Sequence, residues 1–485
     1  MKLHLIGVPR HAAHWTHTSQ RQLQTVYTPP RPNPLWAVAG LVRTAFGGEG
    51  NLLSLLPAAA YRMRVGTLGW SRRMILIVNA PDLLKGILTD PSDIYPKNDL
   101  MVGALAPLVG DSMFVSSGDT WRQQRRMIDP AFSHMRLNRA FEPMAAAVDD
   151  YETHLDDLAT RRTPFSLDLA MSHLTADIIC RTVFSTSPKS ETAREVFDDF
   201  TIFERSVAHV ELKRLIFDKP WSTIPHHQTV LDACERIRKH LGAMVDDHIG
   251  PDGAAFNDIA SAIVAARDLE TGTTFTRKEL IDQLGVFFLA GHETTASALT
   301  WAFYILSQQP QIAQRIRDEV ADICGNGEIA FEHLKRLTFT RNVFRETMRL
   351  YPPITFIPRV AAQATTIGRY NVKKGAMIMI APWTIHRHAS LWKNPHAFDP
   401  DRFSAAREGE LVPGAYLPFG WGPRVCVGAA FATTESALIL ARLIRRYDFN
   451  VDDPASVRPV ARLTTRPAQQ ITCRVTRHSA APSDT

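Results

Sequence analysis

One cysteine, in a glycine-rich loop that runs into a helix, restricts what this 485-residue chain can fold into more than any other feature. Cys426 lies near the end of the loop Phe419–Gly428, and the following segment Ala429–Tyr447 repeats its apolar residues with helical spacing. A thiol at the start of a helix meets the positive end of the helix dipole and unpaired N–H groups, and both favour the thiolate that binds a metal. The alternative is a structural cysteine, which is the commoner case for a lone thiol.

The other residues of this loop fit the neighbourhood of a flat, acidic cofactor. Gly422 and Gly428 would let the backbone approach such a cofactor closely, because they carry no side chain. Phe419 would shield the sulfur from water, and Arg424 would pair with a carboxylate of the cofactor. On these residues alone, a structural turn stays open as the other interpretation.

A second unusual feature is a polar interruption in the long apolar helix expected over Leu284–Leu306. A buried polar group is costly unless it is satisfied, and a glycine costs a helix about 1 kcal/mol. Ala290 and Gly291 would leave room for a ligand against the helix. Thr294 would hydrogen-bond that ligand or a water, and Glu293 would pass protons inward. A threonine that bonds to the carbonyl one turn earlier explains the same residue equally well.

Three shorter motifs would be ordinary on their own. Trp121 and Arg125 lie one helical turn apart in a WxxxR pattern, and Glu346 and Arg349 share a helix face in an ExxR pattern. Arg402 belongs to a PxRF element. Surface charge or an exposed ion pair is the usual explanation of such residues.

In their order along the chain, the patterns WxxxR, AGxETT, ExxR, PxRF and FxxGxRxCxG resemble the motifs of the cytochrome P-450 superfamily. The resemblance extends over about residues 60 to 475. It implies a mainly α fold with a small β subdomain, in which haem b lies between the long central helix and the helix after the cysteine loop. Cys426 would be the axial thiolate ligand of the haem iron, and such a thiolate pushes electron density toward bound oxygen.

The resemblance also implies roles for the other motif residues. Thr294 and Glu293 would serve oxygen activation and proton delivery, whereas Glu346, Arg349 and Arg402 would form a buried structural network. The remaining contacts expected with the cofactor are Trp121, Arg125, Arg359 and Arg424 at the haem propionates, and Phe419, Gly422, Gly428, Ala290 and Gly291 around the ring.

By resemblance, the chain is expected to be a monooxygenase that inserts one oxygen atom of dioxygen into a small hydrophobic substrate, such as a fatty acid or a terpenoid. Electrons from NAD(P)H would arrive through a separate partner, either a ferredoxin with its reductase or a flavoprotein reductase, and Arg122 and Arg126 could help to dock that donor. The expected pocket wall is apolar and consists of Met101, Leu105, Leu108, Phe114, Phe288, Ile354, Phe356 and Leu463.

Two other functions are compatible with a haem-binding chain. A peroxide-dependent haem-thiolate enzyme or isomerase would need no electron donor, but such members of the superfamily commonly lack the pair formed by Glu293 and Thr294. A haem sensor or electron carrier would fill both axial positions of the iron. His292 is the candidate for a second ligand, and it should face away from the iron if Thr294 faces it.

The hydrophobic pattern predicts a mainly helical chain with a minor β part made of distant segments. No linker divides it, so one haem-binding domain is expected over 49–478, between a basic N-terminal arm over 1–48 and a flexible tail over 479–485. Helices are expected over 81–86, 141–158, 167–184, 228–248, 277–307 and 429–447, with a β-hairpin over 61–80 that turns at 69–73 and a second β region near 363–382.

Composition limits the remaining classes. The net charge of +6 is a mild excess that fits a solvated surface or a basic face for an acidic electron donor, and no nucleic-acid partner is expected. The five cysteines are scattered, as in a reducing compartment, and no apolar run reaches the roughly 18 residues that span a membrane. A cytoplasmic, bacterial location is therefore expected, although the acid-free arm could instead contact a membrane surface or direct the chain to an organelle.

Overall fold

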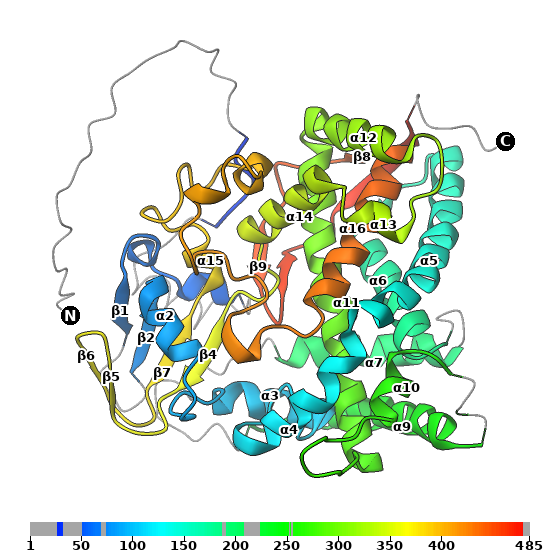
Figure 1. The fold of residues 1–485 in the computed structure, drawn as a ribbon. Helices are drawn as coiled ribbons and strands as arrows, with labels where there is room; N and C mark the ends of the chain where they lie inside the picture. The colour runs from blue at the N-terminus through cyan, green and yellow to red at the C-terminus, as the bar shows by residue number, and fades with distance from the viewer. Residues whose placement is uncertain are drawn as a thin grey trace, which may run out of the picture.

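The computed structural model describes residues 27–32, 51–68, 74–186, 191–207, 224–251, 253 and 256–478, and most of these are helical (Figure 1). The α-helices are α2 (Pro81–Leu88), α3 (Asp99–Val109), α4 (Gly118–Ile128), α5 (His134–Arg161), α6 (Leu167–Val183), α7 (Glu191–Val207), α9 (Gln228–Ile249), α10 (Ile259–Val264), α11 (Arg277–Ser307), α12 (Pro310–Cys324), α13 (Phe331–Leu334), α14 (Thr338–Leu350), α15 (Pro382–Ile385) and α16 (Ala429–Arg446). Short 3-10 helices are η1 (Leu52–Leu55), η2 (Ala58–Tyr61), η3 (Asp129–Phe132), η6 (Pro400–Phe403), η7 (Glu408–Glu410) and η8 (Gly422–Arg424).

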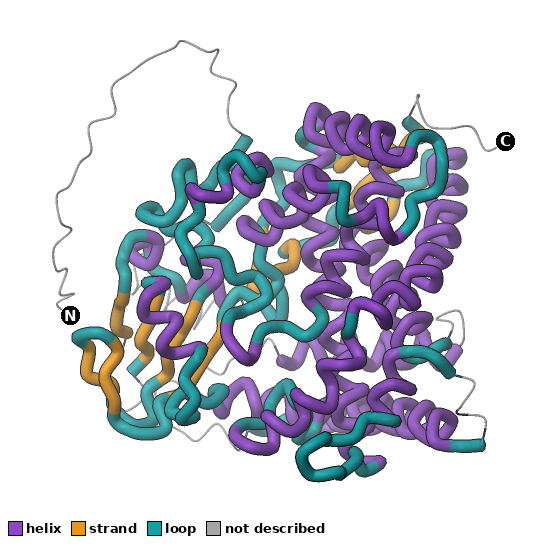
Figure 2. The backbone as a smooth tube through the Cα atoms, in the orientation of Figure 1, coloured by secondary structure: helices purple, strands orange, loops and turns teal. Residues whose placement is uncertain are grey.

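The strands of the described residues form four small sheets, and Figure 2 shows the largest of them at one end of the molecule. The largest sheet has the order β1 (Val65–Leu68), β2 (Ile75–Val78), β7 (Met377–Ile380) and β4 (Ile357–Val360). β2 and β7 run parallel, while β1 and β4 pair antiparallel with their neighbours. The other sheets are β3 (Phe165–Ser166) with β11 (Thr472–Arg477) and β8 (Tyr447–Val451), β9 (Pro459–Ala461) with β10 (Thr465–Pro467), and β5 (Thr365–Ile367) with β6 (Tyr370–Val372).

The long helix α11 runs through the middle of the helical part (Figure 1). It begins with a capping box, in which the Thr276 side chain accepts from the Glu279 N–H and Glu279 bonds back to Thr276. It is apolar nearly all round and buried over most of its length, which is typical of a central helix rather than a surface one. α6 packs along it, and α3, α9, α14 and α16 contact it elsewhere.

The mainly α fold with a small β part of distant segments is confirmed. Each helix predicted from the pattern is present, and α11 has the predicted bounds, Arg277–Ser307. The hairpin is also present as β1 and β2, although its expected turn, residues 69–73, lies outside the described residues.

Of the expected N-terminal arm, only residues 27–32 are described, and these pack against the rest of the molecule rather than extending from it. The Phe398 N–H donates to the Tyr27 carbonyl at 3.0 Å, and the Tyr351 hydroxyl donates to the Pro30 carbonyl at 2.5 Å. The rest of the arm and the tail 479–485 lie outside the described residues. Within the described part of the chain, no helix is both long and apolar enough to cross a membrane.

Candidate active site

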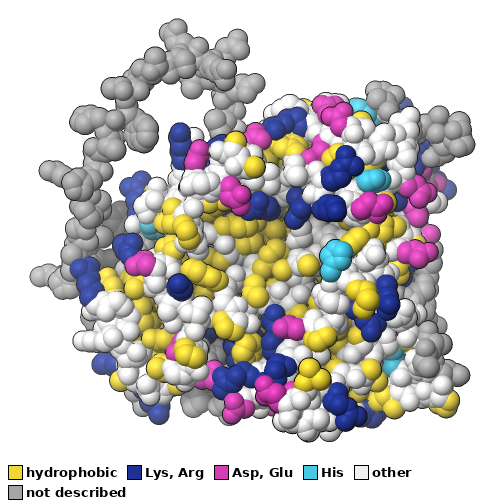
Figure 3. Space-filling model, viewed as in Figure 1, with side chains coloured by type: hydrophobic (Ala, Val, Ile, Leu, Met, Phe, Trp, Pro, Cys, Tyr) yellow, Lys and Arg dark blue, Asp and Glu magenta, His cyan; other side chains and the backbone are white. Residues whose placement is uncertain are grey.

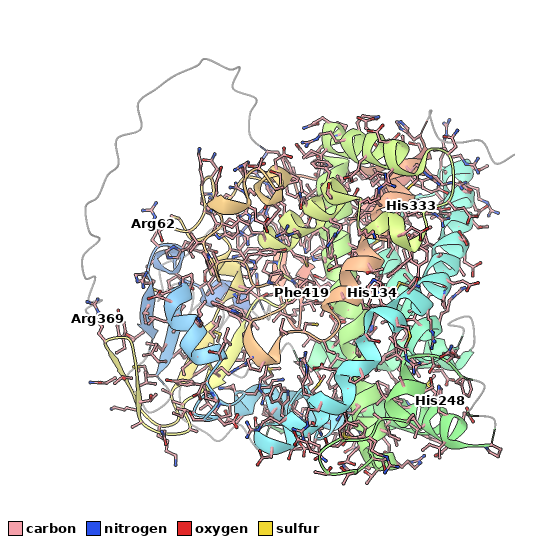
Figure 4. The ribbon with its side chains drawn as sticks, in the orientation of Figure 1. Arg62, His134, His248, His333, Arg369 and Phe419 are labelled. Atoms are coloured by element: carbon pink, nitrogen blue, oxygen red, sulfur yellow. The ribbon has the colours of Figure 1, made fainter. Side chains whose placement is uncertain are left out.

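A cavity of about 630 Å³ brings together segments from both halves of the chain. Its wall comes from α3, α4, α11, β4, the turn between β9 and β10, and residues 419–428, called here the cysteine loop. Figure 3 shows hydrophobic side chains gathered across the middle of the face in view. Phe419 lies there, between the four-stranded sheet and the helices (Figure 4). Residues of the WxxxR, AGxETT and cysteine-loop motifs, which are far apart in sequence, therefore meet at one hollow.

Cys426 is the one cysteine of the five, all of which are described, that lines this cavity. Its N–H donates to the Phe419 carbonyl at 2.9 Å, which closes the cysteine loop just before α16 begins. Cys426 is exposed toward the cavity, but desolvation by the surrounding protein raises the pKa of its thiol, and the Gly428 N–H and Arg125 act in the opposite direction. The net direction differs from the lowering expected at a helix start, because desolvation outweighs these two contacts; a bound metal cation would reverse it.

The glycines differ in why they are needed. Gly428 lines the cavity, and a Cβ there would meet only the Cys426 sulfur, at 3.9 Å, as expected for a backbone that faces a cofactor. Gly422 lies outside the cavity lining: its φ is +77°, and a Cβ would come within 2.5 Å of the Leu88 carbonyl at the end of α2. Although it is predicted to face the cofactor, Gly422 packs against α2 and lies outside the cavity lining. Gly291 lines the cavity, but a Cβ would also collide with Ile179 of α6.

Three cations converge on the cavity: Arg359 is buried, and Lys97 and Arg424 are partly buried. Arg359, predicted as a propionate partner, and Arg424 each have a pKa lowered to about 10, mainly by burial, and Arg424 adds to the effect on Arg359. Burial and these two arginines hold the pKa of Lys97 well below its usual range. Among the described residues, their hydrogen bonds go to the carbonyls of Phe114, Ser116 and Pro358 and not to carboxylates.

One nitrogen of this cluster has no partner at all. The Nη1 of Arg424 donates to the Ser116 carbonyl at 3.0 Å, but its Nη2 is buried without a hydrogen-bond acceptor. Buried cations are stable only when paired. The cluster is thus built for an anionic ligand, and Lys97, which the sequence reasoning missed, belongs to it. A lone lysine after Tyr95-Pro96 carries no pattern that could have revealed this.

Trp121 and Arg125 of α4 both line the cavity, as predicted. The guanidinium of Arg424 stacks on the Trp121 ring at 4.2 Å, which orients both side chains. Arg125 already has partners, because it donates to the Val425 carbonyl at 2.6 Å and pairs with Asp129 at 2.5 Å. Arg125 therefore supports the cysteine loop as well as facing the cavity.

One face of α11 contributes Ala290, Gly291, Glu293 and Thr294 to the cavity wall. The Thr294 hydroxyl donates to the Ala290 carbonyl at 2.8 Å, which is the back-bond weighed in the sequence analysis. That bond uses the hydroxyl proton and leaves the oxygen lone pairs free to accept from a ligand or water in the cavity.

His292 lies on the other side of α11. It is buried, its Nδ1 contacts the Phe288 carbonyl at 2.8 Å, and its ring packs edge-on against Phe200 of α7 at 4.6 Å. It is absent from the cavity lining, as expected if Thr294 faces the cavity. The sensor or carrier function thus loses its candidate second ligand.

Glu293 is buried beside a partner that the sequence did not indicate. Both of its oxygens accept from Arg466 of β10, at 2.7 Å for Oε1, and the Thr464 hydroxyl donates to Oε1 at 2.5 Å. Burial acts to raise the pKa of Glu293, but Arg466 outweighs burial and the net pKa is lowered. Arg466 is 173 residues away in sequence, so neither spacing nor periodicity could have paired them.

The predicted structural network is present away from the cavity wall. Glu346 accepts from Arg349 at 2.7 Å and from Arg402 at 3.2 Å, and these three side chains are almost fully buried. Arg349 also donates to the carbonyls of His386, Pro395 and Ala397, and Arg402 to those of Lys393 and Asn394.

The predicted pocket wall is right in most positions. Met101, Leu105, Phe114, Ile354, Phe356 and Leu463 line the cavity. Leu108 and Phe288 do not, and their prediction is corrected here: Leu108 is fully buried in the core, and Phe288 packs against Phe200 at 5.5 Å. Both lie on helix faces that point into packed helices rather than into the cavity.

Comparison with known proteins agrees with this site. The cytochrome P-450 family model matches residues 29–473. A cyclooctatin synthase from Streptomyces melanosporofaciens is 30% identical over 78% of this chain and 81% of its own length. A cyclooctat-9-en-7-ol 5-monooxygenase from the same organism is 33% identical over 76% of this chain and 78% of its own.

The fold has solved counterparts. A crystal structure of a cytochrome P-450, CYP102L1, superimposes with a TM-score of 0.77 at 23% identity, covering 93% of this chain and 100% of that one. The haem domain of cytochrome P450DA gives 0.74 at 22% identity, over 86% and 90%. The chain therefore belongs to the cytochrome P-450 family and is a monooxygenase of that family.

Proposed function

We propose that this protein binds haem b in the cavity and hydroxylates a bulky hydrophobic substrate of the terpenoid type. The observation that carries the proposal is the meeting of Cys426 with three buried or partly buried cations, Lys97, Arg359 and Arg424, that pair with no carboxylate among the described residues. A thiol and a set of cations around one apolar hollow fit a cofactor that has a metal centre and acidic substituents.

Different residues would bind different parts of that cofactor. The Cys426 sulfur would ligate the iron, and the three cations would pair with the propionates. Gly428 would admit the ring, since a Cβ at that position faces open space apart from the sulfur. When bound, the haem supplies the redox chemistry that activates dioxygen, with electrons that originate from NAD(P)H.

The chain's own side chains would orient the substrate, exclude water and transfer protons. The apolar wall excludes water from the cavity and favours a hydrophobic substrate, which it orients by shape. Thr294 keeps an accepting oxygen toward the cavity, and Glu293 is an ionisable group in the same wall. Together they would transfer the protons that the monooxygenase reaction consumes.

A terpenoid alcohol is favoured over a fatty acid by the relatives. The 33% identical relative is named for the hydroxylation of cyclooctat-9-en-7-ol, an unsaturated alcohol, at position 5. The apolar residues of α3, α11 and the segment 353–358 in the cavity wall suit such a compact, hydrocarbon-rich molecule.

The electron donor is proposed to be a separate ferredoxin with its reductase, or a flavoprotein reductase. Arg122 and Arg126, expected to help dock it, are already paired: Arg122 with Asp93 at 3.0 Å and Arg126 with Asp268 at 3.1 Å. Their charge toward a donor is partly neutralised, so they are weak candidates for the docking surface.

The first experiment is the absorption spectrum of the purified protein, reduced with dithionite under carbon monoxide. A Soret band strongly red-shifted from that of histidine-ligated haem is expected for the wild type and for Cys324→Ser, the control, and its loss is expected in Cys426→Ser. An unshifted band in the intact wild type, or a shifted band in Cys426→Ser, would refute the ligand assignment.

The second experiment tests substrate and reaction together. Cyclic terpenoid alcohols and straight-chain fatty acids of equal carbon number are incubated with NAD(P)H, ferredoxin and ferredoxin reductase, or with hydrogen peroxide alone. Hydroxylated terpenoid formed only with the electron donors is expected. Preferential turnover of the fatty acids contradicts the substrate class, and turnover by peroxide without benefit from donors contradicts reductive activation.

A further inference from the structure

A second carboxyl group lies against Glu293 and has no role in the function proposed above. Glu204 belongs to α7, and its carboxyl group lies close enough to that of Glu293 on α11 for the two to share a proton. It lies four residues after Phe200, which packs on His292, so the same face of α7 carries both contacts. Ser206 and Val207, at the end of α7, line the cavity. α7 therefore covers the acidic part of the cavity wall.

The charges around the two carboxyl groups do not allow both to be ionised cheaply. Arg466 is bound to both oxygens of Glu293, and exposed Arg462 acts on Glu204 from the turn before β10. His292 also acts electrostatically on Glu293, and Asp168 on Arg466. Two carboxylates in hydrogen-bond contact repel each other, and one shared proton removes the repulsion.

The proton resides on Glu204. Burial and the neighbouring Glu293 raise the pKa of Glu204 to about 8, whereas Arg466 keeps the pKa of Glu293 low. At neutral pH the Glu204 O–H therefore donates to the Glu293 carboxylate. A carboxylic acid held neutral in this way is a proton store beside an ionised acceptor.

Glu204 and Glu293 are placed so that a proton can pass from solvent toward the cavity. Glu293 is 1% exposed but reaches the cavity wall, next to Thr294. Glu204 is only half-buried, so it can recover a proton from solvent. The order from outside to inside is thus solvent, Glu204, Glu293, cavity.

We propose that Glu204 is a second proton-carrying residue, which hands its proton to Glu293 when the cavity takes one up. The O–H bond of Glu204 breaks as an O–H bond to a Glu293 oxygen forms; Glu293 then releases a proton into the cavity, and Glu204 takes one from solvent. One proton enters and one leaves, so both side chains return to their starting states. Arg466 and Arg462 stabilise the Glu204 carboxylate formed in between.

The competing explanation is that the contact between Glu204 and Glu293 is only structural. Substitution of Glu204 by glutamine distinguishes that explanation from proton transfer. Glu204→Gln keeps a donor toward Glu293 but holds no transferable proton, whereas Glu204→Asp keeps the acid. Glu195→Gln is the matched control, because Glu195 lies on the same helix with its side chain 62% exposed.

The direct measurement is infrared difference spectroscopy of the haem-loaded protein across a pH titration. A protonated-carboxyl band that disappears above pH 8 is expected in the wild type and in Glu195→Gln and should be missing in Glu204→Gln. Glu435, buried with a strongly raised pKa, should give a second band that persists in every variant. If Glu204→Gln leaves the titrating band unchanged, Glu204 does not hold the proton.

The turnover measurement rests on the proposed monooxygenase function. At pH 7 we expect Glu204→Gln to form product about tenfold more slowly than the wild type and with a larger solvent deuterium isotope effect, and Glu204→Asp to restore much of the rate. Equal rates and isotope effects in wild type and Glu204→Gln would overturn the relay. A wild type that consumes no dioxygen with any donor defeats the proposed function instead, and the infrared result still decides where the proton resides.

Discussion

Two clusters of cations among the described residues, one around Glu346 and one at the cavity, differ in what they contact. Around Glu346, two arginines are nearly fully satisfied by one carboxylate and by backbone carbonyls. Around the cavity, Lys97, Arg359 and Arg424 donate hydrogen bonds to carbonyls and to no carboxylate among the described residues, and one nitrogen of Arg424 has no hydrogen-bond acceptor there. A cluster whose hydrogen bonds are satisfied within the protein stabilises the fold. A cluster of cations without carboxylate partners instead indicates a site where a ligand supplies the missing negative charge.

The largest effect is expected from breaking the satisfied cluster. Arg349→Ala leaves the Glu346 carboxylate buried with one remaining arginine, so the free energy of unfolding should fall by about 3–5 kcal/mol, or the protein should fail to accumulate. Urea denaturation followed by circular dichroism measures this. The control is Arg161→Ala, which breaks an exposed pair with Asp157 and should cost no more than about 1 kcal/mol. Equal losses in the two variants would show that burial does not distinguish the pairs.

At the cavity, unlike around Glu346, removal of an arginine is not expected to lower the free energy of unfolding. Arg359→Met removes a buried cation without a counter-charge, so the haem-free protein should lose no stability, while haem should dissociate about tenfold faster, equivalent to about 1.4 kcal/mol. Transfer of haem to an excess of an apo-globin measures the rate. Arg369→Met is the control, since Arg369 lies just before β6, on the hairpin at the edge of the molecule (Figure 4). Unchanged haem retention in Arg359→Met would remove Arg359 from the cofactor site.

A pH effect sharpens the comparison further. Glu204 has a pKa raised to about 8, so the folded state keeps a proton that the unfolded chain releases near its ordinary pKa of about 4.5. The folded state binds more protons between these values, and the stability of the wild type should therefore fall as pH rises from 5 to 8. Glu204→Gln should lack this fall, which denaturation midpoints at pH 5, 6.5 and 8 would reveal. Parallel pH curves for the two proteins would mean that Glu204 is ionised throughout.

The smallest change in stability, with a clear change in chemistry, is expected at Thr294. Its hydroxyl bonds only to the Ala290 carbonyl within its own helix, so Thr294→Ala should alter the free energy of unfolding by no more than about 0.5 kcal/mol. Haem and substrate binding should persist, but reducing equivalents should be diverted to peroxide. Peroxide formed per NAD(P)H consumed measures the diversion. A fully coupled variant would argue against a role for Thr294 in oxygen activation.

Local signals explain why so much of the fold could be predicted. α11 begins at Arg277, after Thr276, which forms a capping box with Glu279 three residues later, and its apolar run is continuous enough to require a buried helix. The cysteine loop, the Glu346–Arg349 spacing and the alcohol–acid pair of α11 are likewise contiguous patterns, so their elements and their faces follow from the sequence.

Only the tertiary structure decided which distant groups share a site. Lys97, Arg466 and Glu204 lie on separate segments, and their charge states depend on burial and on charged partners. Two of these partners are more than a hundred residues away in sequence: Glu293 for Arg466, and Arg359 for Lys97. The same holds for Leu108 and Phe288, whose apolar character fits a core or a pocket equally well. The sequence by itself determined the helices, the thiol loop and the family, because these are local or contiguous patterns. The three-dimensional packing alone decided where protons and uncompensated charges reside, because desolvation and Coulomb energies depend on distances that no local pattern encodes.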